Sequence, residues 1–291
     1  MNRRQFIQTG AIAVAGTAIA LPGLSMPASN YKVGLQLYTL RDIIGKDPKG
    51  VLKMVADLGY KELETYGYND GMLFGLTSKD FNDYVKSLGM QVMSGHYQLG
   101  KSERSKAMKG TLLNDWERAV SDAKQAGQGY MVVPYLGADE RPTIDSYKEI
   151  CDIMNKSADV CKKYGIRLNY HNHDFEFAKL EGQIPYDVML ERLDPKQVGM
   201  EMDLYWVVYA GFSPLDYFKK YPGRFEQWHV KDMDKTDRKK NADIGTGTID
   251  FKTIFTKAKE SGLKHWYMEE ESYPISSTES VKASIGYLKT L

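Results

Sequence analysis

The chain has 291 residues, of which 42% are hydrophobic, so it can bury a sizeable core, and wholesale disorder is excluded. Lysine and arginine together number 39 against 38 aspartate and glutamate, a net charge of +1. That balance does not provide the basic surface that binds nucleic acid or an anionic membrane, so neither is predicted as a partner.

The first thirty residues resemble an export signal. An arginine pair stands in Asn2-Arg3-Arg4-Gln5-Phe6-Ile7, and a weakly hydrophobic run from Ala11 to Leu21 is followed by Pro22-Gly23 and small residues. A charged start, an apolar centre and a small-residue cleavage region are the parts of a signal peptide, and the arginine pair resembles the twin-arginine type. A membrane anchor is the alternative, but it needs about 20 apolar residues. We expect residues 1–29 to direct the chain to the periplasm without a stable membrane anchor.

From residue 31 onward, strand-like and helix-like segments alternate eight times. Short apolar runs are the predicted strands, and runs with apolar residues at helical spacing, many closed by a glycine, are the predicted helices. The strands are expected at 31–39, 60–66, 91–97, 130–135, 167–173, 198–206, 225–231 and 266–271, and the helices that follow them at 48–58, 78–88, 113–126, 144–164, 186–193, 214–220, 251–260 and 280–288.

This alternation predicts an α/β fold with a parallel sheet covered by helices. Eight such units in about 260 residues match the size of a (β/α)₈ TIM barrel, so we predict one barrel domain over 31–291. The competing doubly wound sheet usually has a glycine-rich turn after its first strand. Thr39-Leu40-Arg41-Asp42 stands there instead. In a barrel the chemistry lies at the C-terminal ends of the strands, so polar residues late in each strand are candidate site residues.

Acidic and histidine residues recur late in the last four predicted strands. Side chains placed in this way converge at the mouth of a barrel, and a mixture of nitrogen and oxygen donors there is typical of a divalent-metal site. The structural alternatives are a histidine satisfied in the core and, for Glu269-Glu270-Glu271, a solvated strand end. In strand five, His171 and His173 share a face, so either could be the ligand. The predicted ligands are His171, Asp203, His229 and Glu269.

Other polar residues surround this predicted centre. Lys231 shares a face with His229 and could neutralise developing charge. Glu176 could fold back over the site, and His173 could move a proton. His96 and Glu64, at the ends of strands three and two, could contact substrate or serve as hydrogen-bonded structural groups. The predicted substrate contacts are His96, Glu64, Trp206 and Glu271.

Three further features are interpreted as structural. Glu201 shares a face with Asp203 but lies deeper, and we expect it to bind a lysine or arginine. Cys151 and Cys161 fall in one predicted helix about 15 Å apart, too far for a disulfide, so buried thiols are expected. Gly245-Thr246-Gly247 is only weakly similar to a phosphate loop and is interpreted as a turn before a helix.

Four segments resemble the xylose-isomerase-like sugar isomerase/epimerase superfamily, namely 34–42, 171–177, 202–206 and 229–232, and the resemblance extends from residue 31 to the end. It implies a TIM barrel that holds Mn²⁺, Mg²⁺, Co²⁺ or Zn²⁺ with a glutamate, an aspartate, a histidine and a second glutamate. Asp203, His229 and Glu269 match the last three, whereas His171 or a neighbour stands in place of the first glutamate. The paired-glutamate epimerisation of the family is therefore incomplete here, unless Glu176 or His173 supplies the second group.

Together these features predict a metal-dependent isomerase or epimerase acting on an unphosphorylated sugar or keto-sugar. The metal would act as a Lewis acid that stabilises an enediolate, and Glu269 or a histidine of strand five would take the proton next to the carbonyl. The alternatives are a keto-sugar lyase or dehydratase of the same superfamily, a non-catalytic periplasmic sugar-binding protein, and a metallo-endonuclease, against which the charge balance argues. No oligomeric state is predicted.

Overall fold

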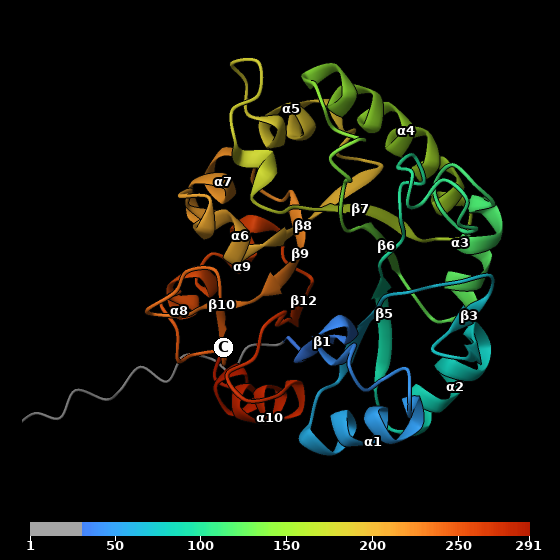
Figure 1. Ribbon diagram of the computed structural model, residues 1–291, viewed down its shortest axis with the longest axis vertical. Coiled ribbons are helices and arrows are strands. Elements are labelled where there is room, and N and C mark those ends of the chain that lie inside the picture. Colours follow the sequence, from blue (N-terminus) through green and yellow to red (C-terminus); the bar gives the residue numbers. More distant parts are fainter. Residues whose placement is uncertain (1–30) are drawn as a thin grey trace, which may run out of the picture.

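The computed structural model describes residues 31–291, which form a (β/α)₈ barrel (Figure 1). Eight parallel strands make one sheet, and its two edge strands meet where His96 pairs with Val132. The predicted TIM barrel is confirmed, and the predicted signal segment lies outside the described residues. In order around the sheet the strands are β5 (Gln91–Gly95), β2 (Glu62–Thr65), β1 (Gly34–Gln36), β12 (His265–Met268), β9 (Phe225–Val230), β8 (Val198–Asp203), β7 (Arg167–His171) and β6 (Tyr130–Val133).

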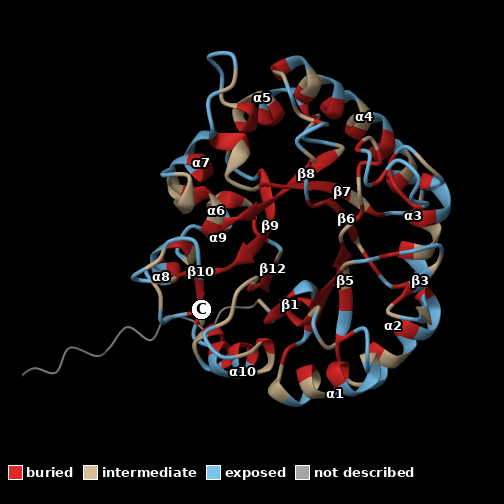
Figure 2. Ribbon diagram, viewed as in Figure 1, coloured by how far each residue is buried: buried red, intermediate tan, exposed pale blue. Residues whose placement is uncertain are grey.

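Helices form a ring outside these strands (Figure 1), and the sides that they turn inward are buried (Figure 2). Side-chain caps set where several of them begin: the carboxylate of Asp47 and the hydroxyl of Thr143 each accept a backbone N–H three residues on. Gly59 ends the first helix with φ at 104°, a conformation that favours glycine. The helices are α1 (Pro48–Leu58), α2 (Ser78–Ser87), α3 (Trp116–Gln125), α4 (Ile144–Lys163), α5 (Pro185–Arg192), α6 (Leu204–Tyr209), α7 (Pro214–Lys220), α8 (Phe251–Phe255), α9 (Ala258–Ser261) and α10 (Ser277–Leu288), with short 3₁₀ helices at Leu37–Leu40 and Phe175–Phe177.

Two small hairpins lie outside the barrel sheet. One pairs β3 (Met72–Leu73) with β4 (Leu76–Thr77), and the other pairs β10 (Asp232–Met233) with β11 (Asn241–Ala242). The second hairpin follows β9 directly and is closed by the carboxylate of Asp232, which accepts the N–H groups of Gly245 and Gly247 at 2.9 and 3.0 Å. The segment Gly245-Thr246-Gly247 is thus a turn around the protein's own carboxylate, as interpreted from the sequence.

All eight barrel strands are shorter than predicted, and two of them end early for the same physical reason. The strand expected at 198–206 ends at Asp203, because Asp203 caps α6 by accepting the N–H of Trp206 at 3.0 Å. The strand expected at 31–39 ends at Gln36, whose side chain accepts the N–H of Tyr38 at 2.9 Å and caps a 3₁₀ helix. In addition, the helix expected at 251–260 is divided into α8 and α9.

The strands separate an apolar outer layer from a polar barrel interior. Along β8 the methionines face the helices, whereas Glu201 and Asp203 face inward, and all of β8 is buried. On the outer side, Trp228 stacks on Phe218 with ring centroids 4.9 Å apart. A polar interior is costly unless its groups find partners, so the inward residues of the strands define where partners or ligands must be.

Cys151 and Cys161 are buried in α4 and form no disulfide within the described chain, as predicted. Burial raises the pKa of both thiols to about 12, which keeps them protonated and unreactive. Over residues 31–291, none of the helices combines the length and the apolar character that crossing a membrane requires.

Candidate metal centre

Four buried side chains converge at the C-terminal ends of β7, β8, β9 and β12. Each offers one ligand atom, and these atoms all lie within 4.8 Å of one another. His171 Nε2 lies 3.5 Å from Asp203 Oδ2, and His229 Nδ1 lies 3.0 Å from Glu269 Oε2. We refer to His171, Asp203, His229 and Glu269 as the upper group. They are the four residues predicted as metal ligands, and metal binding by them stays a prediction.

The donor atoms of the upper group fit a divalent cation. His171 Nδ1 lies 3.1 Å from the carbonyl oxygen of Pro134, which can only accept, so Nδ1 carries the proton and Nε2 presents a lone pair. His171 Nε2 is buried without a hydrogen-bond partner among residues 31–291, whereas Asp203 Oδ2 is paired with the ammonium group of Lys231 at 3.1 Å. Buried polar atoms normally have partners. Donor atoms this close together can share one ion at about 2.0–2.3 Å each.

Lys231 lies against the carboxylates of the upper group. Its Nζ is 3.1 Å from Asp203 Oδ2, 2.8 Å from Glu269 Oε2 and 2.5 Å from Glu271 Oε1. Burial opposes the charge of this ammonium group, but the three carboxylates raise the pKa of Lys231 well above its usual value. Burial also opposes the charge of Asp203, yet Lys231 and His171 lower the pKa of that carboxyl to about 2. Lys231 and Asp203 are therefore both charged in the folded protein, although both are buried.

A second set of side chains lies below the upper group and shares His229 with it. Glu64, His96, Glu201 and His229 again place ligand-type atoms within 4.8 Å of one another, and we refer to them as the lower group. Glu201 lies in this deeper layer as expected, but its partners are histidines rather than lysine or arginine: His96 Nε2 at 3.4 Å and His229 Nε2 at 3.3 Å. Burial, reinforced by the nearby Glu64, raises the pKa of Glu201 to about 7.

A cleft of about 850 Å³ opens above the upper group. Three residues predicted from the sequence, His96, His173 and Glu271, lie in its wall beside His171 and Glu269. Sequence reasoning missed the aromatic part of this wall, Tyr38, Tyr66 and Tyr135, although Tyr38 and Tyr135 follow strands one and four closely. Tyr38 and Tyr135 are 38% and 43% exposed, so they are free to stack on a sugar ring.

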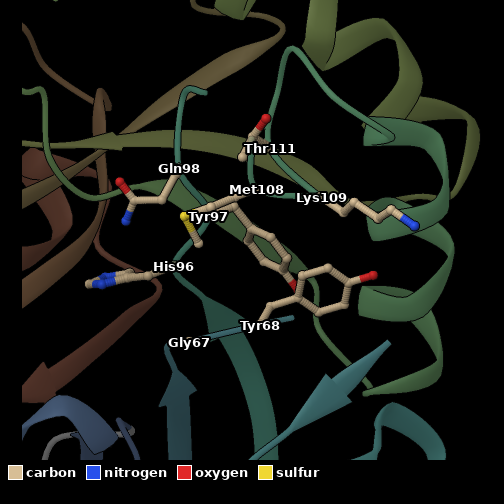
Figure 3. Close-up of a pocket in the computed structure, with 9 residues that line it drawn as sticks. Gly67, Tyr68, His96, Tyr97, Gln98, Met108, Lys109 and Thr111 are labelled. Atoms are coloured by element: carbon tan, nitrogen blue, oxygen red, sulfur yellow. The ribbon is translucent and has the colours of Figure 1, made fainter. Parts of the chain in front are cut away.

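His96 also forms one edge of a small neighbouring cavity of about 50 Å³ (Figure 3). In that view its imidazole points away from the rings of Tyr68 and Tyr97, which lie on the other side of the strand end. Those two rings are packed with centroids 5.3 Å apart, and Tyr68 donates to Asp122. His96 therefore faces the barrel interior, and the tyrosine pair belongs to the packing outside it.

Three predicted site residues lie elsewhere than expected. Glu176 does not fold over the site: it is fully buried, accepts the hydroxyl of Tyr170 at 2.5 Å and accepts the N–H of His173 at 2.9 Å. Glu64 is fully buried in the lower group and does not line the cleft. Trp206 is in α6, with its ring 5.4 Å from that of His173, and stands behind the cleft wall. Of the three, Glu176 and Trp206 hold His173, which does line the cleft.

Fold and site together define a sugar-isomerase type of TIM barrel, and the chain belongs to the xylose isomerase-like TIM barrel family, whose model matches residues 52–291. It is similar to an inosose dehydratase of Geobacillus kaustophilus (strain HTA426), with 24% identity over 251 residues, 76% of this chain and 78% of that protein. It is also similar to the crystal structure of a sugar phosphate isomerase/epimerase from Parabacteroides distasonis ATCC 8503, with 30% identity, a TM-score of 0.76, and coverage of 88% of this chain and 97% of that one.

A third likeness concerns the fold alone. The IOLI protein, crystallised with a zinc atom, has a TM-score of 0.68 at 14% identity, over 87% of this chain and 95% of that one. Of these similar proteins, one is named an inosose dehydratase and one a sugar phosphate isomerase/epimerase.

Proposed function

We propose that this chain is a divalent-metal-dependent enzyme that acts on an unphosphorylated sugar or keto-sugar by removing the proton next to a carbonyl group. The observation that carries this proposal is the upper group beneath the cleft, where four buried ligand-type side chains converge and His171 Nε2 is unpartnered within the described chain. A cation held by His171, Asp203, His229 and Glu269 supplies a Lewis acid that polarises a carbonyl. The IOLI protein, which shares this fold, was crystallised with a zinc atom, and this supports the proposal of a divalent metal.

His173 is the side chain best placed to take the proton. It lines the cleft, and its Nδ1 has no hydrogen-bond partner in the described chain. Burial and the nearby His171 and Lys231 lower the pKa of His173 well below its usual value, so the ring is neutral and can accept a proton. Glu269 suits this role less well, because its Oε2 already lies against His229 and Lys231.

Lys231 is suited to balance negative charge that develops on the substrate oxygen. Its ammonium group is buried behind Glu269 and Glu271, which line the cleft, and contacts Asp203, Glu269 and Glu271, two of which are proposed cation ligands. A fixed, buried positive charge acts more strongly on a neighbouring oxygen than a solvated one does. Lys231 therefore serves the site without binding the cation.

The cleft wall favours an uncharged substrate. Glu103, Asp139, Glu140, Glu269 and Glu271 are acidic, and Arg104 is the only lysine or arginine among the described residues that line it. A phosphate group would meet repulsion there. We propose an unphosphorylated sugar for this reason, although one similar structure is named a sugar phosphate isomerase/epimerase. Export to the periplasm, which we propose from residues 1–29, agrees with this because sugar phosphates are rare outside the cytoplasm.

A keto-sugar lyase or dehydratase is the second candidate. Removal of the same proton leads either to reprotonation, which is isomerisation or epimerisation, or to loss of a substituent from the next carbon. The similarity to an inosose dehydratase favours elimination. So does the site itself, since Glu176, one of the two groups predicted to complete an acid/base pair, is turned away from the cleft.

The test uses metal content and proton exchange together. Asp203→Ala and Glu269→Ala should lose bound metal by elemental analysis, whereas the surface variant Asp83→Ala, at 56% side-chain exposure, should retain it. Candidate keto-sugars incubated in D₂O with the wild type should take up deuterium next to the carbonyl, or lose a substituent, by NMR. Unchanged metal in both site variants would contradict the proposed centre, and stoichiometric sugar binding without exchange would make the chain a binding protein.

A further inference from the structure

We propose that Glu64 is a positioning residue that keeps the proton of His229 on Nε2, so that His229 Nδ1 is presented to the upper group. The two groups share His229: its Nδ1 faces Glu269 at 3.0 Å, and its Nε2 faces Glu64 Oε1 at 2.6 Å. This inference rests on the proposed function, because it concerns how the chain prepares a ligand for a cation. It also gives Glu64 a role other than the substrate contact predicted from the sequence.

The argument starts at the end of β1, where Gln36 caps the 3₁₀ helix. The N–H of Tyr38 donates to Gln36 Oε1 at 2.9 Å, and a backbone N–H can only donate. The orientation of the Gln36 amide is therefore fixed, with its oxygen toward Tyr38. Its nitrogen must then face the barrel interior, where Gln36 Nε2 donates to Glu64 Oε1 at 2.7 Å.

Gln36 Nε2 donates to Glu64 Oε1, so this oxygen is an acceptor, as in an ionised carboxylate. His229 Nε2, 2.6 Å from the same oxygen, must carry its proton to make a hydrogen bond there. In a neutral imidazole the lone pair is then on Nδ1, the nitrogen that lies beside Glu269 in the upper group. A chain of hydrogen bonds from the backbone of Tyr38, after β1, thus selects one tautomer of a histidine on β9, two strands away in the barrel sheet.

Glu64 Oε1 lies within hydrogen-bond distance of three nitrogens, Gln36 Nε2, His229 Nε2 and His96 Nε2, the last at 3.1 Å. The other carboxylate oxygen, Glu64 Oε2, is buried without a hydrogen-bond partner among residues 31–291. Glu64 therefore contacts His229 through Oε1 alone. Glu64 is also fully buried, so it touches neither substrate nor solvent. It acts through His229.

The strand that carries Glu64 also provides a matched control. Glu62, two residues earlier on β2, is a buried glutamate whose carboxylate lies 2.7 Å from a histidine, His265, at the opposite end of the barrel. Glu62→Gln and Glu64→Gln are thus the same change, in the same strand, with the same kind of partner. Only Glu64 is joined to the upper group, so a merely structural role would give the two variants similar behaviour.

The experiment titrates purified wild type, Glu64→Gln and Glu62→Gln with Co²⁺, followed by visible absorption, and with Zn²⁺ in competition. We expect Glu64→Gln to weaken cation affinity by about 10–100-fold and to alter the Co²⁺ spectrum, as loss of a carboxylate behind a ligating histidine does. Glu62→Gln should match the wild type. In ¹⁵N-histidine NMR of the Zn²⁺-loaded wild type, His229 should carry its proton on Nε2.

Each outcome separates this inference from the proposed function. If the wild type binds neither cation, the metal centre itself is refuted. If the wild type binds both and Glu64→Gln binds them as Glu62→Gln does, the positioning role of Glu64 is refuted while the metal centre stands. If Glu64→Gln does not fold, Gln36→Met takes its place. This variant lacks the amide that donates to Glu64, and we expect it to bind the cations more weakly than Glu62→Gln does.

Discussion

The ammonium nitrogen of Lys231 lies 2.8 Å from Oε2 of Glu269, inside the barrel and out of contact with solvent. The positive charge of Lys231 therefore lies beside Asp203 and Glu269, two carboxylates that we propose as cation ligands. Without a bound cation, Lys231 is the main group that balances Asp203, Glu269 and Glu271. The stability of the barrel and its affinity for cations are linked through this one side chain.

Replacing Lys231 with Met should destabilise the cation-free protein by about 3–5 kcal/mol, because buried carboxylates lose their partner. Added Zn²⁺ or Mn²⁺ should restore part of that loss, so the cation should raise the unfolding temperature more in the variant than in the wild type. Thermal unfolding with and without the cation measures both effects. The exposed pair Lys53–Asp57 is the control, and Lys53→Met should leave the unfolding temperature close to that of the wild type. Equal losses in the two variants would contradict the buried charge balance.

The two histidines of β7 and its exit should have separable roles. His171→Gln should lower cation affinity, because His171 Nε2 faces Asp203 Oδ2 at 3.5 Å. His173→Gln should leave cation binding intact but reduce kcat by about 10²–10⁴-fold, the usual contribution of a general base. Metal content and steady-state rates on an active keto-sugar distinguish them. The assignment is reversed if His173→Gln loses the metal and His171→Gln keeps it.

The stability of the chain should depend on Glu176 in a pH-dependent way. Burial raises the pKa of Glu176 to about 7 in the folded protein, whereas a free glutamate titrates near about 4.3. Between these values the folded state keeps a proton that the unfolded chain loses, so stability falls as pH rises through this range. Glutamine does not titrate, so the stability of Glu176→Gln should not fall with pH for this reason.

Urea unfolding of both proteins between about pH 5 and about pH 8 measures the difference. We expect the stability of Glu176→Gln relative to the wild type to increase with pH by an amount on the order of 3 kcal/mol. Parallel curves for the two proteins over this range would show that Glu176 does not titrate there.

Two glycines should respond oppositely to alanine. At Gly286, inside α10, an added methyl group has no atom within 4 Å, so Gly286→Ala should stabilise the protein by about 0.5–1 kcal/mol. At Gly34, in β1, the methyl group would lie 2.3 Å from the carbonyl oxygen of Trp266, so Gly34→Ala should destabilise it. Thermal unfolding compares them. A loss of stability at Gly286 would mean that α10 does not have the open outer face described.

The fold could be predicted from the sequence because its signals are local. Apolar spacing at Val51, Leu52 and Val55, with Gly59 after it, marks α1 within one turn, and the count of such units gives the barrel. The ends of strands were less predictable, because a single polar residue decides them. Asp203 and Gln36 both sit in apolar, extended-looking runs and instead cap the turn that follows.

Only part of the candidate site could be predicted, namely the residues that follow the rule that site residues of a barrel lie at the C-terminal ends of its strands. That rule brings His171, Asp203, His229 and Glu269 together, as the structure shows. It does not reveal that Glu64 contacts His229, since the two are 165 positions apart and on strands that are not neighbours. It also misplaces Glu176, because the 3₁₀ turn at Phe175–Phe177 carries that side chain behind β7.

The two oxygens of Asp203 make different contacts. Oδ1 accepts the N–H of Trp206 at the start of α6, and Oδ2 lies beside His171 in the upper group. Helix α6 in turn reaches the outside of the molecule, where the Tyr205 hydroxyl donates to the carbonyl of Arg238 at 2.6 Å. A shift of the Asp203 carboxylate toward an ion would therefore also move the start of α6 and the loop around Arg238. These two contacts connect the barrel interior with its surface, so a fluorescent probe attached near Arg238 should change its signal when a cation binds to the upper group.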